Sequence, residues 1–416
     1  MKDIYFGCSK QISRLGYLRR NVEHMRKLQQ TLPQSKLIVF NNRDNQSKRR
    51  EVLINSIANQ KKLSYLDVHS HEIFQDILHK WLQFNIDIES HVVEKTVIPW
   101  SQIDEELKAV SIFWLGQDDS GITTSENVGT SVFSIDISNS DLLYNYITEH
   151  VKTAGHSFTN GMPSVLQLSN EDASAYSYSK MFIDFISKNR YCPACGGHIV
   201  AVNLGSRLYC LNDSPWDDPA RCEANLTSNN LQFPRTDLVV IIALYDSSGR
   251  ILLGNNKRHP GKIVEKNDET SGKLVKWTSK MYSCFAGFME PGETIEQACV
   301  REVYEETGLE LQPQDVKIIE SQPWPFPANI MIGCMAILRE EQTDDRKINV
   351  HLDDELEHVS WFDSENVSKV IKGADIGILS KSDTEVEEWF LPSPESVAGR
   401  LIGRAVDACS DLRGKF

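Results

Sequence analysis

The sequence predicts a mixed α/β protein with more than one domain, and three observations lead to this prediction. The chain has 416 residues, of which 40% are hydrophobic, which is enough for a buried core and suggests about two or three domains. Strand-like apolar runs such as 238–244 alternate with segments of helical periodicity such as 171–189. Four of the nine cysteines lie between Cys192 and Cys222, so we expect a small metal-binding module between the N-terminal and C-terminal parts.

The N-terminal part, residues 1–185, contains strand and helix patterns but no catalytic motif. Segment 14–32 is predicted to be a basic amphipathic helix, which we interpret as a solvated helix face. Apolar runs predict strands at 37–40, 112–116 and 132–135. We therefore expect a mixed α/β domain here, and the sequence leaves its role open.

The C-terminal part also alternates strands and helices. Residues 238–244 form an unbroken apolar run typical of a buried strand, and 250–254 would return antiparallel after the turn-like residues 246–249. The lysine-, glutamate- and glycine-rich segment 257–280 is expected to be an exposed loop. The remaining predicted elements are a strand at 282–286, a helix at 294–307, strands at 331–338 and 357–362, and a closing helix from about 396.

The charge of the chain limits its partners. It carries 44 Lys and Arg against 58 Asp and Glu, a formal net charge of −14, so it is a poor non-specific binder of nucleic acid or anionic membranes. No apolar run approaches the length of a membrane span, and Met1–Arg20 lacks the apolar core of a secretory signal. Arg413–Phe416 does not match the Ser-Lys-Leu class of peroxisomal signals. We expect a cytoplasmic protein with no membrane partner.

Three glutamates in the predicted helix 294–307 are candidates for metal binding. Glu302, Glu305 and Glu306 are spaced i, i+3 and i+4, so their carboxylates share one helix face. Such hard oxygen ligands suit Mg²⁺ or Mn²⁺, and Arg301 would pair with Glu293. Taken alone, the three glutamates fit a solvated acidic face better than a metal site.

The residues on either side of these glutamates favour the metal site over the solvated acidic face. Five residues separate Gly287 from Glu293, seven more separate Glu293 from Arg301, and the run Arg-Glu-Val-Tyr-Glu-Glu-Thr-Gly-Leu follows. This pattern resembles the Nudix box at every defined position. The resemblance implies an α/β/α sandwich around a mixed sheet, with the box forming a loop, a helix and a loop. It also implies that Glu302 and Glu306 bind the catalytic metal with the help of Glu305, and it makes the backbone carbonyl of Ala286 a further ligand candidate.

Residues 321–329 carry the pattern that selects a substrate. Three prolines alternate with aromatic residues, which stiffens the segment and fixes where the rings point; such rings can stack on nicotinamide or adenine. The alternative is a proline-rich loop packed on the core. As a unit, the segment resembles the signature of the NADH pyrophosphatase branch of the Nudix family, except that Asn329 stands where the family usually has Ser. The candidate substrate-binding residues here are Gln322, Pro323, Trp324, Pro325, Phe326, Pro327, Ala328 and Asn329.

Further matches to this branch follow in the same order along the chain. Residues 233–237 resemble its aromatic-Pro-Arg-Thr-Asp run, and Glu355 stands at the position of a further metal-binding Glu. The segment 392–398 resembles the closing segment, in which Ala398 would back the substrate. Phe288 and Trp324 are candidates to stack on nicotinamide, with Phe233 a weaker one. The resemblance covers about residues 170–405.

The four clustered cysteines predict a structural zinc site. Cys192 and Cys195 are followed after fourteen residues by Cys210 and after eleven more by Cys222, which suggests a zinc ribbon with all four Zn²⁺ ligands supplied by the protein. The second gap is longer than in the simplest ribbons. A partly degraded site is one alternative, and His198 as the fourth ligand is another.

The resemblance implies three domains and a hydrolase. These are an N-terminal α/β domain at 1–185, a zinc ribbon at 186–232 and a Nudix domain at 233–416. The implied reaction is Mg²⁺- or Mn²⁺-dependent cleavage of the diphosphate bond of NADH or NAD⁺ into nicotinamide mononucleotide and AMP. One alternative is removal of the NAD cap from RNA by the same cut, and another is a non-catalytic dinucleotide-binding protein. The family also implies a homodimer, and its members occur in peroxisomes as well as in the cytosol.

Overall fold

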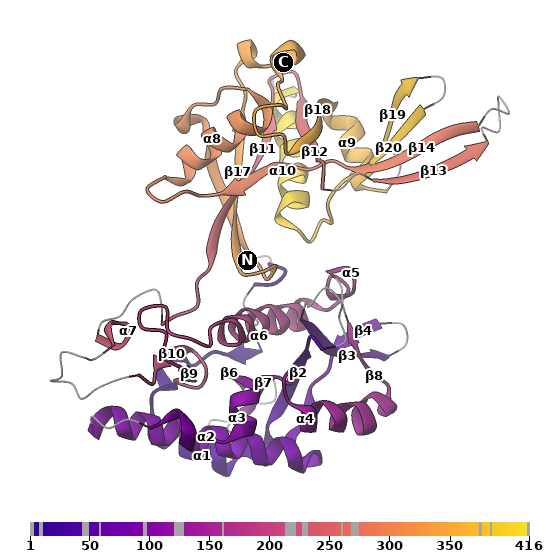
Figure 1. Ribbon diagram of the computed structural model, residues 1–416. Coiled ribbons are helices and arrows are strands. Elements are labelled where there is room, and N and C mark those ends of the chain that lie inside the picture. The colour runs from indigo at the N-terminus through magenta and orange to yellow at the C-terminus, as the bar shows by residue number, and fades with distance from the viewer. Residues whose placement is uncertain are drawn as a thin grey trace. The chain divides into compact units, whose positions relative to one another are not determined.

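The computed structural model forms two compact units (Figure 1). Unit 1 is Met1–Arg235 together with Pro325–Ala328, and unit 2 is Thr236–Trp324 together with Asn329–Phe416. The predicted boundary between residues 185 and 186 lies inside unit 1 and stays a prediction. The insertion between Cys210 and Cys222 from residue 213 onward, and the last three residues of the tail, lie outside the described residues. The described residues are 4–7, 11–43, 50–57, 60–94, 98–119, 129–159, 162–212, 222–226, 232–258, 261–267, 274–373, 377–382 and 385–413.

A mixed eight-stranded sheet forms the centre of unit 1. Its strands β2 and β7 run parallel and all its other pairs are antiparallel. The order is β1 (Ile12–Ser13), β6 (Ser111–Asp118), β7 (Thr130–Asp136), β2 (Lys36–Asn41), β3 (Glu51–Ile57) and β4 (Gln60–Leu63), with β5 (Leu66–Asp67) beside β2 and β8 (His156–Thr159) beside β3. The predicted strands at 37–40, 112–116 and 132–135 are confirmed.

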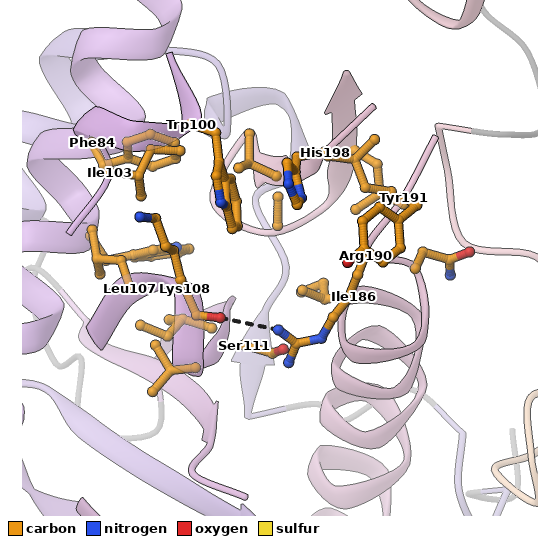
Figure 2. A pocket seen from close by; sticks show the side chains of 18 residues that line it. Phe84, Trp100, Ile103, Leu107, Lys108, Ser111, Ile186, Arg190, Tyr191 and His198 are labelled. Carbon is orange, nitrogen blue, oxygen red and sulfur yellow. Dashed lines mark hydrogen bonds between the residues drawn. The ribbon is translucent and has the colours of Figure 1, made fainter. Parts of the chain in front are cut away.

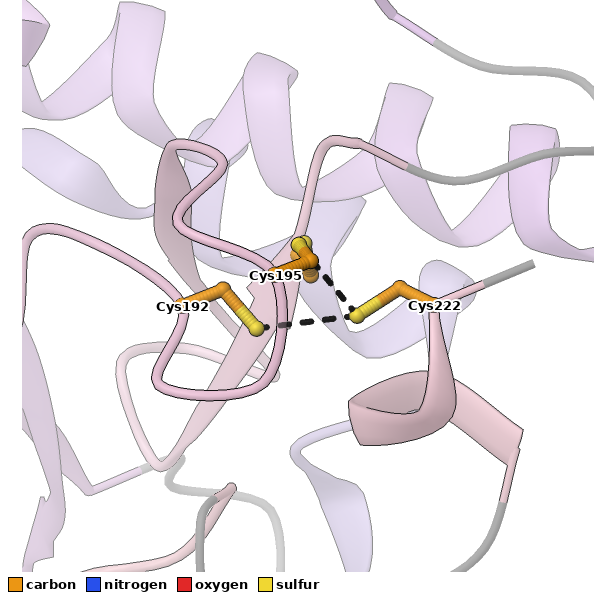
Figure 3. Close-up of side chains that lie close together, drawn as sticks. Cys192, Cys195 and Cys222 are labelled. Carbon is orange, nitrogen blue, oxygen red and sulfur yellow. Dashed lines mark hydrogen bonds between the residues drawn. The ribbon is translucent and has the colours of Figure 1, made fainter. Parts of the chain in front are cut away.

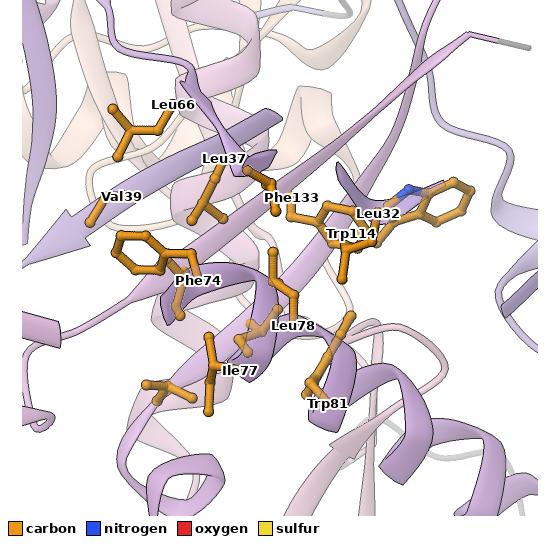
Figure 4. Close-up of a cluster of buried hydrophobic side chains, with 14 of the residues drawn as sticks. Leu32, Leu37, Val39, Leu66, Phe74, Ile77, Leu78, Trp81, Trp114 and Phe133 are labelled. Carbon is orange, nitrogen blue, oxygen red and sulfur yellow. The ribbon is translucent and has the colours of Figure 1, made fainter. Parts of the chain in front are cut away.

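Helices cover both faces of this sheet because successive strand residues point to opposite sides. Trp114 faces the core beneath α1 (Val22–Gln30) and α2 (Glu72–Glu94), which Figure 4 shows with Trp81 and Phe133. Its neighbour Phe113 points the other way and stacks on Phe182 of α6 (Asn170–Lys188), with ring centroids 4.0 Å apart. The other helices of unit 1 are α3 (Glu105–Ala109), α4 (Asp141–Tyr146), α5 (Met162–Val165) and α7 (Glu223–Leu226).

The cysteine-rich part of unit 1 has its own two-stranded antiparallel sheet. Strand β9 (Ile199–Val202) pairs with β10 (Arg207–Cys210). The hydrophobic core around the cysteines has few members, with Ile199, Leu208 and Ala224 as its other buried residues. So small a core suits a module that depends on another source of stability.

A mixed sheet also forms the centre of unit 2, so the predicted mixed α/β fold is confirmed. Strand β11 (Asp237–Tyr245) lies parallel to β17 (Asn329–Ile337) and antiparallel to β12 (Arg250–Asn256) and β15 (Phe285–Phe288). The path through the sheet is β16 (Lys317–Trp324), β17, β11, β12 and β18 (Leu356–Asp363).

Alternation along β11 produces the two cores of unit 2. Val240 and Ile242 belong to the core that contains residues of α8 (Ile295–Thr307). Ile241 belongs to a second core that contains residues of α10 (Val397–Arg413). The unbroken apolar run predicted from the sequence is therefore a strand buried on both faces. A shorter helix, α9 (Ser364–Ile371), follows β18.

One prediction for unit 2 is wrong. The segment 257–280 was expected to be an exposed loop, but it contains β13 (Lys262–Asn267) and most of β14 (Leu274–Met281). These strands join a four-stranded sheet with β20 (Glu385–Phe390) and β19 (Gly377–Ser382), in which β14 and β20 are parallel. Pairing with a strand about a hundred residues away is tertiary context that local polar composition does not reveal. No helix within the described ranges is long and apolar enough to span a membrane.

Candidate active site

Local sequence signals fix both ends of α8, the helix that carries the candidate glutamates. Thr294 caps its start, where the Thr294 side chain accepts from Gln297 N and the Gln297 side chain accepts from Thr294 N. The helix ends at Gly308, whose φ of 72° suits glycine and whose N–H donates to Tyr304 O at 2.7 Å. These two caps therefore fix where α8 begins and ends, and so fix the position of its glutamates beside β15.

Close approach of β15 to α8 explains the glycine of the box. Strand β15 pairs with β11, so that Ala286 lies opposite Ile241. A Cβ atom on Gly287 would lie about 2.0 Å from the carboxylate of Glu302. Any larger residue would displace the Glu302 carboxylate from this position, so the glycine allows that carboxylate to lie against the β15 backbone.

Arg301 organises the carboxylates around it. Its guanidinium contacts both oxygens of Glu293, at 2.7 and 3.0 Å, as the sequence analysis expected. The same guanidinium donates to Glu302 Oε1 at 2.7 Å, to Glu305 Oε2 at 2.9 Å and to Phe288 O at 2.8 Å. One arginine therefore joins the loop before α8 to two of the three candidate carboxylates.

Glu306 is the candidate carboxylate for which no contact with Arg301 is found among the described residues. Its side chain is 4% exposed, and its Oε2 atom is buried without a hydrogen-bond partner. Burial raises the pKa of Glu306 from its usual 4.5 to about 9, with further contributions from Glu302, Asp353 and Glu355. Burial also raises the pKa of Glu302. A buried acidic group held in this way needs either a proton or a cation beside it.

The residues around Glu306 fit a divalent cation by their chemistry. The charges of Glu302 and Glu355 act on Glu306, those of Glu305 and Glu355 act on Glu302, and the Ala286 N–H donates to the Glu306 carboxylate. Carboxylate oxygens are the ligands typical of Mg²⁺ or Mn²⁺. Glu355 lies just before β18 and is paired with Arg258 at 3.1 Å. Among the described residues, the cysteines are the one group whose ligand atoms lie close enough together to hold a metal. Glu302 and Glu305 are instead bridged by Arg301.

Asp353 is an acidic neighbour that the sequence analysis missed. It lies two residues before Glu355, and its charge helps to raise the pKa of Glu306. The sequence contains one signal for Asp353, the acidic run Asp353-Asp354-Glu355, in which only Glu355 matched the family pattern.

The segment 321–329, which is predicted to bind the substrate, spans the end of one strand and the start of the next. Trp324 ends β16 and lies opposite Asn329, the first residue of β17. Asn329 is 7% exposed, and its Oδ1 atom is buried without a hydrogen-bond partner. Pro325, Phe326, Pro327 and Ala328 form the turn between these strands and belong to unit 1.

Gln322 is fully buried, and both the nitrogen and the oxygen of its side-chain amide form hydrogen bonds inside unit 2. Its Nε2 donates to Glu395 O at 2.9 Å, and its Oε1 accepts from Val397 N at 2.7 Å. These bonds tie β16 to the start of α10, where Ala398 is buried and accepts a long contact of 3.8 Å from Cys284 Sγ. Gln322 therefore positions the segment that contains Ala398.

The two other aromatic candidates are surface residues. Phe288 ends β15 and is 56% exposed, and its carbonyl is held by Arg301. Phe233 belongs to unit 1, is exposed, and lies 5.9 Å from the guanidinium carbon of Arg207. An exposed ring at the end of β15, beside the carboxylates, is available for stacking on a planar ligand.

The four predicted zinc ligands lie together in unit 1 (Figure 3). Their sulfur atoms all lie within 4.8 Å of one another, and three contacts between them measure 3.5 to 3.6 Å. Zn–S bonds of about 2.3 Å in a tetrahedron place sulfurs about 3.8 Å apart, whereas a disulfide needs about 2.05 Å. The cluster, made of Cys192, Cys195, Cys210 and Cys222, therefore has the spacing of a tetrahedral metal site.

His198, the alternative fourth ligand, is engaged elsewhere. Its ring stacks on Trp100 with centroids 4.2 Å apart, at the edge of a cavity of about 150 Å³ that also contains Lys108 and Arg190 (Figure 2). Arg190 donates to the Lys108 carbonyl at 3.1 Å across this cavity. The sulfur cluster does not include His198.

Comparison with known proteins identifies one domain of the chain. Residues 235–393 match the model described as the NUDIX domain. The chain contains a Nudix domain. Its Nudix domain contains the β15–α8 unit, the segment 321–329 and Glu355, so the described carboxylates lie within the matched residues.

Relatives of this Nudix protein support the NADH pyrophosphatase-type subfamily. It is 35% identical over 251 residues to the NAD-capped RNA hydrolase of Saccharomyces cerevisiae, covering 60% of this chain and 59% of the relative. It is 34% identical over 266 residues to that of Schizosaccharomyces pombe, covering 63% of each chain. The human NAD-capped RNA hydrolase is 30% identical over 242 residues, covering 58% of this chain and 43% of the relative. The chain thus matches less than two thirds of the length of each relative.

Proposed function

We propose that this protein hydrolyses the diphosphate bond of an NAD moiety, either free as NADH or NAD⁺ or attached as a cap to RNA. The main observation behind the proposal is the buried Glu306 carboxylate, one oxygen of which has no hydrogen-bond partner among the described residues. Glu306 lies on the same helix face as Glu302 and Glu305, which Arg301 contacts. The names of the relatives favour the capped RNA as a second substrate. A pure dinucleotide-binding protein would gain nothing from such a costly buried carboxylate.

The carboxylates and the β15 backbone are assigned to metal binding. Glu302, Glu306 and Glu355, with Glu305 and the Ala286 carbonyl, would hold Mg²⁺ or Mn²⁺. When bound, the metal supplies neutralisation of the diphosphate charge and activation of a water molecule. Arg301 positions the carboxylates, since each of its three nitrogens already has a carboxylate or carbonyl acceptor.

Glu305 is assigned as the group that takes the proton from the attacking water. Its side chain is 43% exposed, so water can reach its carboxylate, whereas Glu306 is buried. The water oxygen forms a bond to one phosphorus, the bond from that phosphorus to the bridging oxygen breaks, and the bridging oxygen leaves with the other phosphate. The products are nicotinamide mononucleotide and AMP, or an RNA with a 5′-monophosphate.

Substrate recognition is assigned to the β16–β17 junction and the end of β15. The rings of Trp324 and Phe288 would stack on the nicotinamide or adenine, and Asn329 Oδ1 would accept a hydrogen bond from the ligand. Its lack of a partner among the described residues supports this role, because an unsatisfied buried oxygen costs about 1–3 kcal/mol. Gln322 acts as a positioning residue for Ala398.

The cysteine cluster is assigned to a structural Zn²⁺. Four sulfur ligands leave no position for a water or substrate, which is typical of structural sites. Zinc binding would contribute on the order of 10 kcal/mol to folding of this module, which has little core of its own. The subfamily resemblance also leads us to propose a homodimer, which sedimentation at several concentrations would test.

The proposed activity is tested by adding Mg²⁺ to the full chain with NADH, NAD⁺ or NAD-capped RNA and separating the products. We expect cleavage of all three between the two phosphates. Glu305→Gln should slow it by about 10²-fold or more, and the matched variant Glu310→Gln, at an exposed position after α8, should retain it. Binding of NADH without cleavage would instead favour the non-catalytic alternative.

A further inference from the structure

Unit 1 contains a larger cavity, of about 560 Å³, whose lining includes Phe326 and Pro327 of the candidate substrate-binding segment but none of the carboxylates assigned to hydrolysis. It lies where the parallel strands β2 and β7 end, and its lining includes Asn42 just after β2 and Asp136 at the end of β7. Ligands of open sheets bind at the carboxyl ends of parallel strands. The volume also falls within the range of about 300–1,000 Å³ that is typical of small-molecule sites.

Buried charges form one wall of this cavity. Arg50 is buried and pairs with Asp136 at 2.9 Å and with Asp184, and Lys180 of α6 is buried and pairs with Asp184 at 2.6 Å. Lys188 adds a third cation, 3.8 Å from Asp184. Three cations thus face two carboxylates, which leaves the wall with an excess positive charge in a chain of net charge −14.

Lys180 has the capacity to bind a ligand. An ammonium group has three donors, and within the described residues Nζ has one hydrogen bond, to Asp184 Oδ2. Burial lowers the pKa of Lys180 and the Asp184 carboxylate opposes this shift. A bound anion beside Nζ would stabilise the charged ammonium further.

Aromatic rings line the same cavity. Tyr176 lies one helical turn before Lys180 on α6, and its ring centroid is 6.5 Å from that of Phe326. The Lys180 ammonium lies 5.8 Å from the centre of the Phe326 ring. A ligand with an anionic group and a planar ring would therefore meet a complementary surface.

We propose that this cavity binds a nucleotide, with its phosphate beside Lys180 and Lys188 and its base against Tyr176 and Phe326. The site goes beyond the proposed function because none of the carboxylates assigned to metal binding belongs to its lining. The nucleotide could be free, like the mononucleotide products, or part of an RNA chain, and the shared chemistry is a phosphate next to a base. Mononucleotide and RNA probes distinguish the two sources.

The test measures binding in the full chain with both Nudix carboxylates removed, by Glu302→Gln with Glu306→Gln. Calorimetry without Mg²⁺ uses AMP, inorganic phosphate and a short single-stranded RNA with a 5′-monophosphate as probes. We expect AMP or the RNA to bind, and the probe that binds identifies the source. Adding Lys180→Gln should weaken that binding about tenfold or more, because it removes a charged donor.

Two matched variants keep the result interpretable. Lys61→Gln removes another part-buried lysine of unit 1, which donates to Ser164 outside the cavity lining, and should bind normally. Lys180→Arg keeps the charge and should retain most of the binding, whereas loss of binding in a folded Lys180→Arg variant comparable to that in Lys180→Gln would count against a role for this charge. Binding of none of the probes, or equal binding by the Lys180→Gln and Lys61→Gln variants, would overturn the proposal. Since no turnover is measured, these outcomes are independent of the proposed hydrolysis.

Discussion

Replacing Glu306 with glutamine should strongly slow hydrolysis and yet stabilise the metal-free protein. The buried Glu306 carboxyl has its pKa raised from 4.5 to about 9, so the folded chain keeps a proton that the unfolded chain loses above about pH 4.5. The free energy of unfolding therefore falls as the pH rises through this window, by about 1.4 kcal/mol for each pH unit. Glutamine is neutral throughout and has no such dependence.

The size of the effect follows from that slope. Between pH 5 and pH 8 the wild type should lose about 4 kcal/mol relative to Glu306→Gln, or roughly 10 °C in melting temperature for a domain of this size. Mg²⁺ should stabilise the wild type more than the variant, because the variant lacks one metal-binding carboxylate. Turnover of NADH should fall by about 10²-fold or more.

Thermal melts at pH 5 and pH 8, with zinc left in place and no other divalent cation added, measure this prediction. Glu310→Gln provides the control, since Glu310 is exposed and its replacement should leave the melting profile unchanged. Parallel melting profiles for wild type and Glu306→Gln across this pH range would refute the argument from burial. Near-normal turnover in the variant would refute the metal-binding role.

Three further predictions concern Trp324, Gly287 and the cysteine cluster. Trp324→Ala should reduce kcat/KM for NADH roughly 5- to 150-fold relative to diadenosine diphosphate, as expected for one lost stacking contact; equal losses with a much lower melting temperature would mean that Trp324 packs the core. Gly287→Ala should slow hydrolysis by about 10²-fold, because its Cβ would collide with the Glu302 carboxylate, whereas Gly403→Ala, with open space around its Cβ, should be neutral. Cys222→Ser should lower the zinc content measured by elemental analysis and the melting temperature of the protein; full zinc content would exclude Cys222 as a ligand.

The sequence was informative where structure depends on local signals. Thr294 and Gly308 mark the two ends of α8 by capping chemistry that is encoded within a few residues. The apolar run of β11 needs no partner to be recognised. The helical spacing of Phe74, Ile77 and Leu78 could also have predicted α2, which the sequence analysis overlooked.

Features that depend on distant contacts were not predictable in this way. Strand β14 lies mostly within the polar segment 257–280 and pairs with the distant strand β20. The occupied amide of Gln322 depends on Glu395 and Val397, more than seventy residues away. The unpartnered oxygen of Glu306 is likewise a product of burial, which the spacing of three glutamates does not specify. Motif spacing thus identified the candidate residues, whereas their division into binding and positioning roles needed the packed structure.

Product analysis with NADH tests the central claim most directly. Wild-type protein with Mg²⁺ should give reduced nicotinamide mononucleotide and AMP in equal amounts, and Glu302→Gln should give them at least about 10²-fold more slowly. The same cut on NAD-capped RNA should leave a 5′-monophosphate. Absence of cleavage of both substrates with Mg²⁺ and Mn²⁺, or release of nicotinamide and ADP-ribose in place of the two mononucleotides, would contradict the account.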